Sequence, residues 1–178
     1  QYENVDGNNP GVGGLKTALP QVRDGFTPQQ IDLGRYLFFD PVLSKDGTVS
    51  CASCHQPEKG FSDGLFTSVG VDHSRLKRAA PSLWNVAFYN KLFWDARASS
   101  LEEQMMGPLF SEEEMGNTRE QLLSKMNSIE QYQHLFRQAF PKKLSDDIEL
   151  NEIYTAITAF ESDVVKWNLK HAAELRFP

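Results

Sequence analysis

The two cysteines of the sequence both belong to the run Cys51-Ala52-Ser53-Cys54-His55. Two thiols at this spacing, followed at once by a histidine, form the attachment motif of a c-type haem. Cys51 and Cys54 would each add to a vinyl group of the haem, and the imidazole of His55 would bind the iron as the proximal ligand. A ligating imidazole is neutral, with its other ring nitrogen held by a carbonyl or carboxylate. The sequence does not identify that partner, but it predicts one covalently bound haem c.

Two other kinds of site use a similar pair of thiols. A thioredoxin-like redox pair normally lies in a βαβ pattern, which this sequence lacks. A tetrahedral zinc site needs further thiolates or closely spaced imidazoles. The other histidines, His73, His134 and His171, are scattered singly along the chain. The motif therefore favours haem attachment over both alternatives.

Composition places this motif in one acidic domain. The chain has 178 residues and a net charge of −6, which favours one domain and argues against nucleic acid or an anionic membrane surface as a partner. No apolar run reaches transmembrane length, and no basic region followed by a hydrophobic stretch begins the sequence. Haem attachment in bacteria takes place outside the cytoplasmic membrane. We therefore expect a mature periplasmic protein, or one at the cell surface, whose export signal has been removed.

The first element that must position the motif is a helix beginning near Thr27. Residues 1–25 are rich in Gly, Asn and Pro, so we expect an irregular arm there. Thr27 is a suitable N-cap, Pro28 suits the first helical position, and Gln30 completes a capping box. The dipeptide Asp40-Pro41 should end this helix.

The segment around the haem motif should be rich in loops. Turn-forming residues recur from Val42 to Lys77 without a sustained helical or strand period. A capping box at Ser100–Glu103 predicts a short helix that Gly107-Pro108 terminates. The acidic run Ser111–Glu114 has the composition of a solvated helix start.

Helices should make up the rest of the chain. We expect one from about Glu120 to Met126, one from Ile129 to Phe140, and a longer one from about Asn151. The last carries an apolar stripe with alternating spacings of four and three: Ile153, Ile157, Phe160, Val164 and Trp167. The predicted fold is mainly α, a cytochrome c-like helical haem domain with long loops, in which a single domain over residues 26–178 follows the arm.

Several ordered segments between Thr27 and Glu161 carry a family resemblance. They are Leu33-Gly34-Arg35-Tyr36-Leu37-Phe38-Phe39-Asp40-Pro41, Gly47-Thr48-Val49-Ser50-Cys51, Ala80-Pro81-Ser82-Leu83-Trp84-Asn85-Val86-Ala87-Phe88, Phe93-Trp94-Asp95-Ala96-Arg97, Leu101-Glu102-Glu103-Gln104 and Ala156-Ile157-Thr158-Ala159-Phe160-Glu161. In this order they resemble the amino-terminal half of bacterial di-haem cytochrome c peroxidases and the related MauG group.

The resemblance implies a peroxidatic site. In that family hydrogen peroxide binds the amino-terminal haem opposite the proximal histidine, and a second haem domain supplies electrons. Gln104 and Glu114 match the family's distal polar pair, and Trp94 matches the tryptophan between the haems. Peroxide must lose a proton from its iron-bound oxygen and gain one on the leaving oxygen, and Glu114 would shuttle that proton. The amide of Gln104 would orient peroxide and stabilise developing charge.

Each of these residues also has an interpretation that requires no peroxide. Glu114 is the third residue after Ser111 and could complete a capping box, and Gln104 could be a solvent-facing helix residue. Trp94, beside Phe93, could simply pack in the core.

The sequence also departs from the family pattern. A second haem-attachment motif is absent, which leaves a fragment, a natural single-haem relative or one part of an assembly. Family members commonly carry a distal histidine just after the segment that matches Ser68-Val69-Gly70. Here Val71 follows, so His73 is the candidate distal iron ligand, with a surface histidine as the alternative. Ala79 replaces an asparagine that helps to hold calcium in the family, so no calcium is expected by that route.

The resemblance therefore predicts a c-type haem peroxidase domain that reduces hydrogen peroxide to water. Its electrons would come from a small redox protein or from a second haem domain. One alternative is an electron-transfer cytochrome c with a six-coordinate iron. Its nominal methionine ligands are Met105, Met106, Met115 and Met126. The other alternative is a MauG-like oxidation of a protein substrate, with electrons withdrawn through Trp94.

Overall fold

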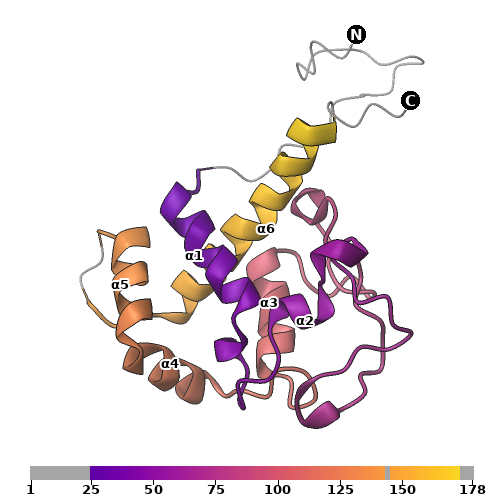
Figure 1. Ribbon diagram of the computed structural model, residues 1–178, viewed down its shortest axis with the longest axis horizontal. Helices are drawn as coiled ribbons and strands as arrows, with labels where there is room; N and C mark the ends of the chain where they lie inside the picture. Colours follow the sequence, from indigo (N-terminus) through magenta and orange to yellow (C-terminus); the bar gives the residue numbers. More distant parts are fainter. Residues whose placement is uncertain (1–24, 143–144, 173–178) are drawn as a thin grey trace.

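The computed structural model describes residues 25–142 and 145–172, the last part, 165–172, as backbone only. Apart from Gly25, the arm predicted for residues 1–25 lies outside the described residues. Figure 1 shows the helices α1 (Pro28–Phe39) and α6 (Leu150–Ala172) crossing near the middle of the molecule. Helices α4 (Arg119–Ser128) and α5 (Glu130–Ala139) lie on one side, and the loops around α2 (Cys51–Cys54) lie on the other.

Helix α1 (Pro28–Phe39) forms as the sequence predicts. Thr27 Oγ1 accepts a hydrogen bond from Gln30 N at 3.2 Å, and Gln30 Oε1 accepts one from Thr27 N at 3.0 Å. The helix ends at Asp40, whose N–H donates to the carbonyl of Tyr36. The predicted capping box and stop signal are therefore confirmed.

Helix α6 (Leu150–Ala172) is the long helix against which α1 packs. Gly34 permits close contact, because a Cβ there would collide with the carbonyl of Ala156. Ile153, Ile157 and Phe160 of the predicted stripe are buried and Val164 is partly buried. The side chain of Trp167 lies outside the described residues. The stripe is thus a core face over its described length.

Helix α3 (Leu101–Phe110) differs from the prediction at its end. Gly107-Pro108 does not terminate it: Pro108 lacks the N–H that would bond to the carbonyl of Gln104, but Ser111 N donates to Gly107 O at 2.9 Å, so helical bonding resumes. At the other end, Ser100 Oγ accepts from Glu103 N as predicted. The Glu103 carboxylate bonds instead to the backbone N and hydroxyl of Ser99, which leaves the predicted box incomplete.

The acidic run after α3 is a turn and not a helix start. Glu114 N donates to Ser111 O at 3.1 Å, and the next helix begins only at Arg119. The prediction of a solvated helix start is wrong because the chain here must reverse direction: Met115 N donates back to Pro108 O at 3.1 Å.

Helices α4 (Arg119–Ser128) and α5 (Glu130–Ala139) agree with the prediction. The ammonium of Lys125 on α4 bonds to the carbonyls of Val42 and Lys45 at 3.3 Å and of Ser44 at 2.6 Å. These bonds tie α4 to the segment that leads into the haem motif.

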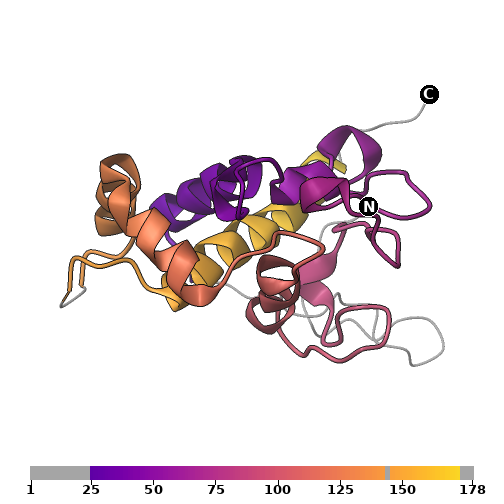
Figure 2. The same ribbon diagram turned by 90° about the horizontal axis from the view of Figure 1, so that it is seen from below.

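Loops dominate from Val42 to Ser100. The 3₁₀ helix η2 (Pro41–Leu43) begins this part of the chain, and one turn of α-helix, α2 (Cys51–Cys54), follows it. The later 3₁₀ helices are η3 (Pro57–Lys59), η4 (Val71–His73) and η5 (Val86–Phe88). In Figure 2 these loops gather on one side of the molecule. The described residues form single antiparallel bridges but no strand, so the prediction of a mainly helical fold with long loops is confirmed. No described helix has the length and apolarity to span a membrane.

Candidate functional site

Helix α2 is a single turn that carries the haem-attachment motif. Ser50 precedes it and donates its backbone N–H to Ser53 Oγ at 3.0 Å. His55 ends it and donates its backbone N–H to Cys51 O at 2.9 Å. Because one turn separates the two thiols, Cys51, Cys54 and His55 all lie on the wall of the same cavity.

This cavity has a volume of about 510 Å³. Such a volume is within the range of cofactor and small-molecule pockets. Its apolar lining comes from four parts of the chain and includes Leu83, Val86, Leu92, Leu101, Met105, Leu109 and Ile157. An apolar cavity that also presents two free thiols and an imidazole fits a covalently bound haem.

The imidazole of His55 is held in the form that binds a metal. Its Nδ1 lies 3.0 Å from the carbonyl of Phe61. A carbonyl only accepts, so Nδ1 carries the hydrogen and Nε2 is the ligating nitrogen. Burial lowers the pKa of His55, although the carbonyls of Phe61 and Pro81 oppose the shift. The ring is therefore neutral near pH 7, as iron ligation requires.

Phe61 is the ring partner that the sequence did not identify. Its backbone has a φ of 56°, in the left-handed region, and its N–H donates to Gln56 O at 2.8 Å. This tight reversal, closed by a bridge between Gln56 and Ser62, turns the Phe61 carbonyl toward His55. No side chain signals the contact, because only a backbone carbonyl makes it.

The two thiols do not resemble those of a redox pair. Burial, followed by the charge of Glu161, raises the pKa of Cys51 to about 12, and burial also raises the pKa of Cys54. Reactive cysteines of redox motifs have lowered pKa values. Among the residues that the structure describes, no cluster of three His, Cys, Asp or Glu could hold a metal ion, so the zinc alternative finds no further ligands.

The structure brings Gln104 and Glu114 to the wall of the cavity that holds the motif. Gln104 lies within α3 and Glu114 in the turn after it, and both are half-buried. Burial raises the pKa of Glu114, while the charge of Arg97 opposes the rise. The capping-box interpretation of Glu114 is wrong, since no helix begins at Ser111.

Gly70 helps to place Glu114, and sequence reasoning did not give it this role. A Cβ on Gly70 would collide with the carbonyl of Glu113 and lie 2.8 Å from Glu114 Cα. The next residue, Val71, donates its N–H to Glu114 O at 2.9 Å. Two loops distant in sequence therefore meet here through their backbones.

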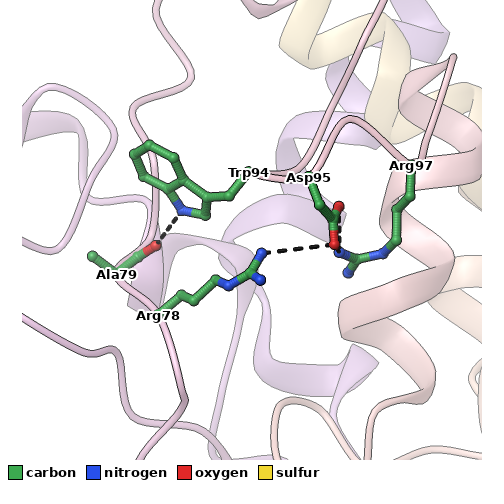
Figure 3. Close-up of polar contacts among 5 residues, drawn as sticks. All are labelled: Arg78, Ala79, Trp94, Asp95 and Arg97. Atoms are coloured by element: carbon green, nitrogen blue, oxygen red, sulfur yellow. Dashed lines mark hydrogen bonds and ion pairs between the residues drawn. The ribbon is translucent and has the colours of Figure 1, made fainter.

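A cluster at the cavity rim joins two further loops, as Figure 3 shows. Trp94 is 66% exposed, lines the cavity, and donates its indole N–H to Ala79 O at 3.2 Å. Asp95 accepts two hydrogen bonds of 2.8 Å from Arg97 and pairs with Arg78 at 3.7 Å. The core interpretation of Trp94 is therefore wrong, because its indole is mostly in solvent.

His73 has a different position from the other candidates. It is exposed, has a φ of 57°, and is not among the residues that line the cavity. This position agrees with the alternative of a surface histidine. The geometry does not support His73 as a distal iron ligand.

Glu161 is an acidic residue of the cavity wall to which the sequence analysis gave no role beyond its place in a family motif. Glu161 on α6 is 8% exposed, and its Oε2 is shielded from solvent without a hydrogen-bond partner. Burial raises its pKa to about 8. The helical stripe could have located it, because it lies one turn after Ile157.

Comparison with known proteins shows which proteins this chain is similar to. The family model described as di-haem cytochrome c peroxidase matches residues 28–174. The methylamine utilization protein MauG of Methylorubrum extorquens is 37% identical over 139 residues, which cover 78% of this chain and 39% of that protein. The cytochrome c551 peroxidase of Nitrosomonas europaea is 39% identical over 142 residues, which cover 78% of this chain and 42% of that protein.

Solved structures show the same fold. A MauG-like protein associated with microbial copper homeostasis has a TM-score of 0.77 and 30% identity, over 92% of this chain and 51% of its own. A dihaem peroxidase from Burkholderia thailandensis has a TM-score of 0.70 and 25% identity, over 86% of this chain and 44% of its own. The chain thus spans about two fifths of the length of the curated relatives above.

Proposed function

Because this chain belongs to the di-haem cytochrome c peroxidase family, we propose that it is a c-type haem domain that reduces hydrogen peroxide to water. The observation that carries the proposal is that one apolar cavity holds both the attachment motif and the pair Gln104 and Glu114. One haem would be bound, through Cys51 and Cys54, with His55 on its iron. The bound haem would supply an iron that binds peroxide and accepts electrons.

Glu114 would move the proton that peroxide cleavage requires. Its carboxylate would take a proton from one oxygen of the peroxide and return it to the other, so that water departs. Arg97 favours the ionised form that accepts the proton, since its charge lowers the pKa that burial raises. The amide of Gln104 would orient the peroxide and stabilise developing charge in a cavity largely lined by apolar residues.

Electrons would arrive from a small redox protein or from a second haem domain. Trp94 is suited to their path, because its indole both lines the cavity and reaches solvent. The same exposure supports a second candidate function, the MauG-like oxidation of a protein substrate docked against Trp94. A periplasmic location would follow from haem attachment outside the cytoplasmic membrane.

The electron-carrier alternative needs a histidine or a methionine as the sixth iron ligand. Met105 and Met115 are buried and line the cavity, whereas Met126 is fully buried and is not among its lining residues. A carrier would show a stable six-coordinate iron and no reaction with peroxide. A peroxidase would keep one iron position open to peroxide.

Substitution of Glu114 by Gln tests the proposal. Glu114→Gln retains the shape of the side chain and removes its proton exchange, so peroxide cleavage should slow by about a hundredfold to ten-thousandfold. The measurement is stopped-flow absorbance of the haem after one equivalent of peroxide. The control is Glu112→Gln, an exposed position of the same turn that does not line the cavity. A Glu114→Gln protein that reacts at the parent rate would contradict the proposal.

A further inference from the structure

The buried carboxyl group of Glu161 has no role in the chemistry proposed above. It lies on the cavity wall contributed by α6, one turn after Ile157, and is 8% exposed. Its Oε2 has no hydrogen-bond partner and no contact with solvent. An ionised carboxylate in such a position is costly, because neither solvent nor a donor among the described residues contacts Oε2.

The charged groups around Glu161 add to this cost. Glu102 on α3 raises the pKa of Glu161, and the charge of Glu161 in turn raises the pKa of Cys51 on α2. The cations that line the cavity are Lys77, Arg78, Lys91 and Arg97, and none of them is among the groups that shift Glu161. Among the residues whose side chains the structure describes, no cation is near enough to lower the pKa of Glu161 and compensate its negative charge.

The other elements packed against α6 contribute apolar surface. The buried residues of α1 are Leu33, Gly34, Leu37 and Phe38, and η5 consists of Val86, Ala87 and Phe88. Burial and Glu102 together raise the pKa of Glu161 to about 8. The protonated acid is therefore the main form at neutral pH, and a positive charge arriving nearby would favour ionisation.

We propose that Glu161 takes up one proton when haem bound at Cys51 and Cys54 gains an electron, and releases that proton when the haem is oxidised. This inference rests on the haem attachment of the proposed function. Cys51 would carry the thioether, and the charge of Glu161 reaches Cys51. Oxidation leaves one more positive charge on the haem, which stabilises the nearby Glu161 carboxylate through a wall of low polarity.

The step balances in charge and atoms. A one-electron reducing agent supplies the electron and water supplies the proton. Ferric haem and the Glu161 carboxylate become ferrous haem and the Glu161 carboxylic acid, and the O–H bond is the only bond formed. Each electron that enters the domain would thus arrive with a compensating proton, and the net charge of the cavity would stay constant.

The test is the haem midpoint potential as a function of pH, measured by spectroelectrochemistry between pH 5 and 9. In the parent protein the potential should fall as pH rises, by up to about 59 mV for each tenfold change in proton concentration. Glu161→Gln should make the potential nearly independent of pH over that range. Thr158→Val is the matched control, because Thr158 is a buried hydroxyl one turn earlier on α6, lacks a hydrogen-bond partner and does not titrate. This control should keep the parent slope.

Two results would overturn the inference: a parent potential that does not depend on pH, or a Glu161→Gln protein that keeps the parent slope. If Glu161→Gln does not fold, the parent protein with ¹³C-labelled glutamate supplies a second measurement. Its redox-difference infrared spectrum should then show a labelled carboxylic acid band that appears on reduction and persists in Glu114→Gln. Absence of that band contradicts the inference.

This test also separates the inference from the proposed function. A purified protein without attached haem would contradict both. An attached haem whose potential does not depend on pH would contradict the role of Glu161 alone, and it would leave peroxide reduction by Gln104 and Glu114 intact.

Discussion

At the scale of single residues, Arg97 links the rim of the cavity to Glu114, the proposed proton carrier. It is fixed by two hydrogen bonds to Asp95, and its guanidinium lies 3.4 Å from the ring centroid of Phe93. The same cation opposes the rise in the pKa of Glu114. Planar guanidinium groups are suited to such combined pairing and stacking. We infer that Arg97 is a positioning residue that sets the protonation of Glu114.

The pH profile of the peroxide reaction tests this inference. Burial raises the pKa of Glu114, so the rate should fall as pH falls through that pKa and the carboxylate is lost. Arg97→Gln removes the opposing charge, raises the pKa further, and should move this acid limb to higher pH. Arg78→Gln is the control, because Arg78 also pairs with Asp95 but is not among the groups that shift Glu114. An acid limb that stays in place in Arg97→Gln would rule out this role.

At the scale of elements, contacts through backbone atoms position the residues of the site. Gly70 lets the loop before η4 touch the 113–114 turn, and the carbonyl of Phe61 fixes the ring of His55. Lys125 gathers three carbonyls of the segment before α2. Helices α2 and α3 thus carry Cys51, Cys54 and Gln104, while backbone contacts of the loops orient His55 and place Glu114.

Gly70→Ala should disturb both stability and catalysis. The new Cβ would collide with the carbonyl of Glu113, and such overpacking typically costs about 1–3 kcal/mol. Movement of the turn would also displace Glu114 and slow peroxide cleavage. Chemical denaturation and stopped-flow absorbance measure the two effects. Arg75→Ala, at an exposed position of the same loop, should change neither. Unchanged stability in Gly70→Ala would show that the turn can move freely.

Local signals explain which elements the sequence could predict. The start of α1 depends on Thr27, Pro28 and Gln30 alone, so its capping box was predictable. The end of α3 was not, because whether Pro108 stops a helix depends on tertiary contacts, among them the bond from Met115 N to Pro108 O.

The site itself divides in the same way. The spacing of Cys51, Cys54 and His55 predicts a shared location, and the three residues line one cavity. The resemblance predicted Gln104 and Glu114, and their convergence on one cavity requires the fold. The contacts of Phe61 and Gly70 involve backbone atoms, so no pattern of residue types predicts them. The apolar stripe of α6 indicates the buried face on which Glu161 lies, but the lack of a partner for its Oε2 depends on packing between helices.

At the scale of the whole molecule, the haem should act as part of the hydrophobic core. The cavity of about 510 Å³ is lined by side chains that also belong to the main hydrophobic cluster, among them Leu92, Met105 and Leu109. An empty apolar cavity forfeits the packing that its lining would otherwise make. The folded state of the chain without haem should therefore be much less stable than that of the protein with haem attached.

A variant with Cys51→Ser and Cys54→Ser tests this dependence. Without thioether links, we expect near-UV circular dichroism to lose its cooperative thermal transition, whereas the parent protein should keep one. Cys54→Ser alone retains one link and should give an intermediate melting temperature. Equal melting temperatures in all three proteins would mean that the helical frame is stable without the haem.

The high pKa of the Cys51 thiol also bears on the order of events during maturation. The thiolate is the reactive form of cysteine. In the folded chain a pKa of about 12 leaves almost no thiolate at neutral pH. We therefore expect the bond to the haem to form before the chain folds around Cys51. A chain that folds first should attach haem more slowly, because the reactive thiolate is then rare, so attachment should precede folding of this domain.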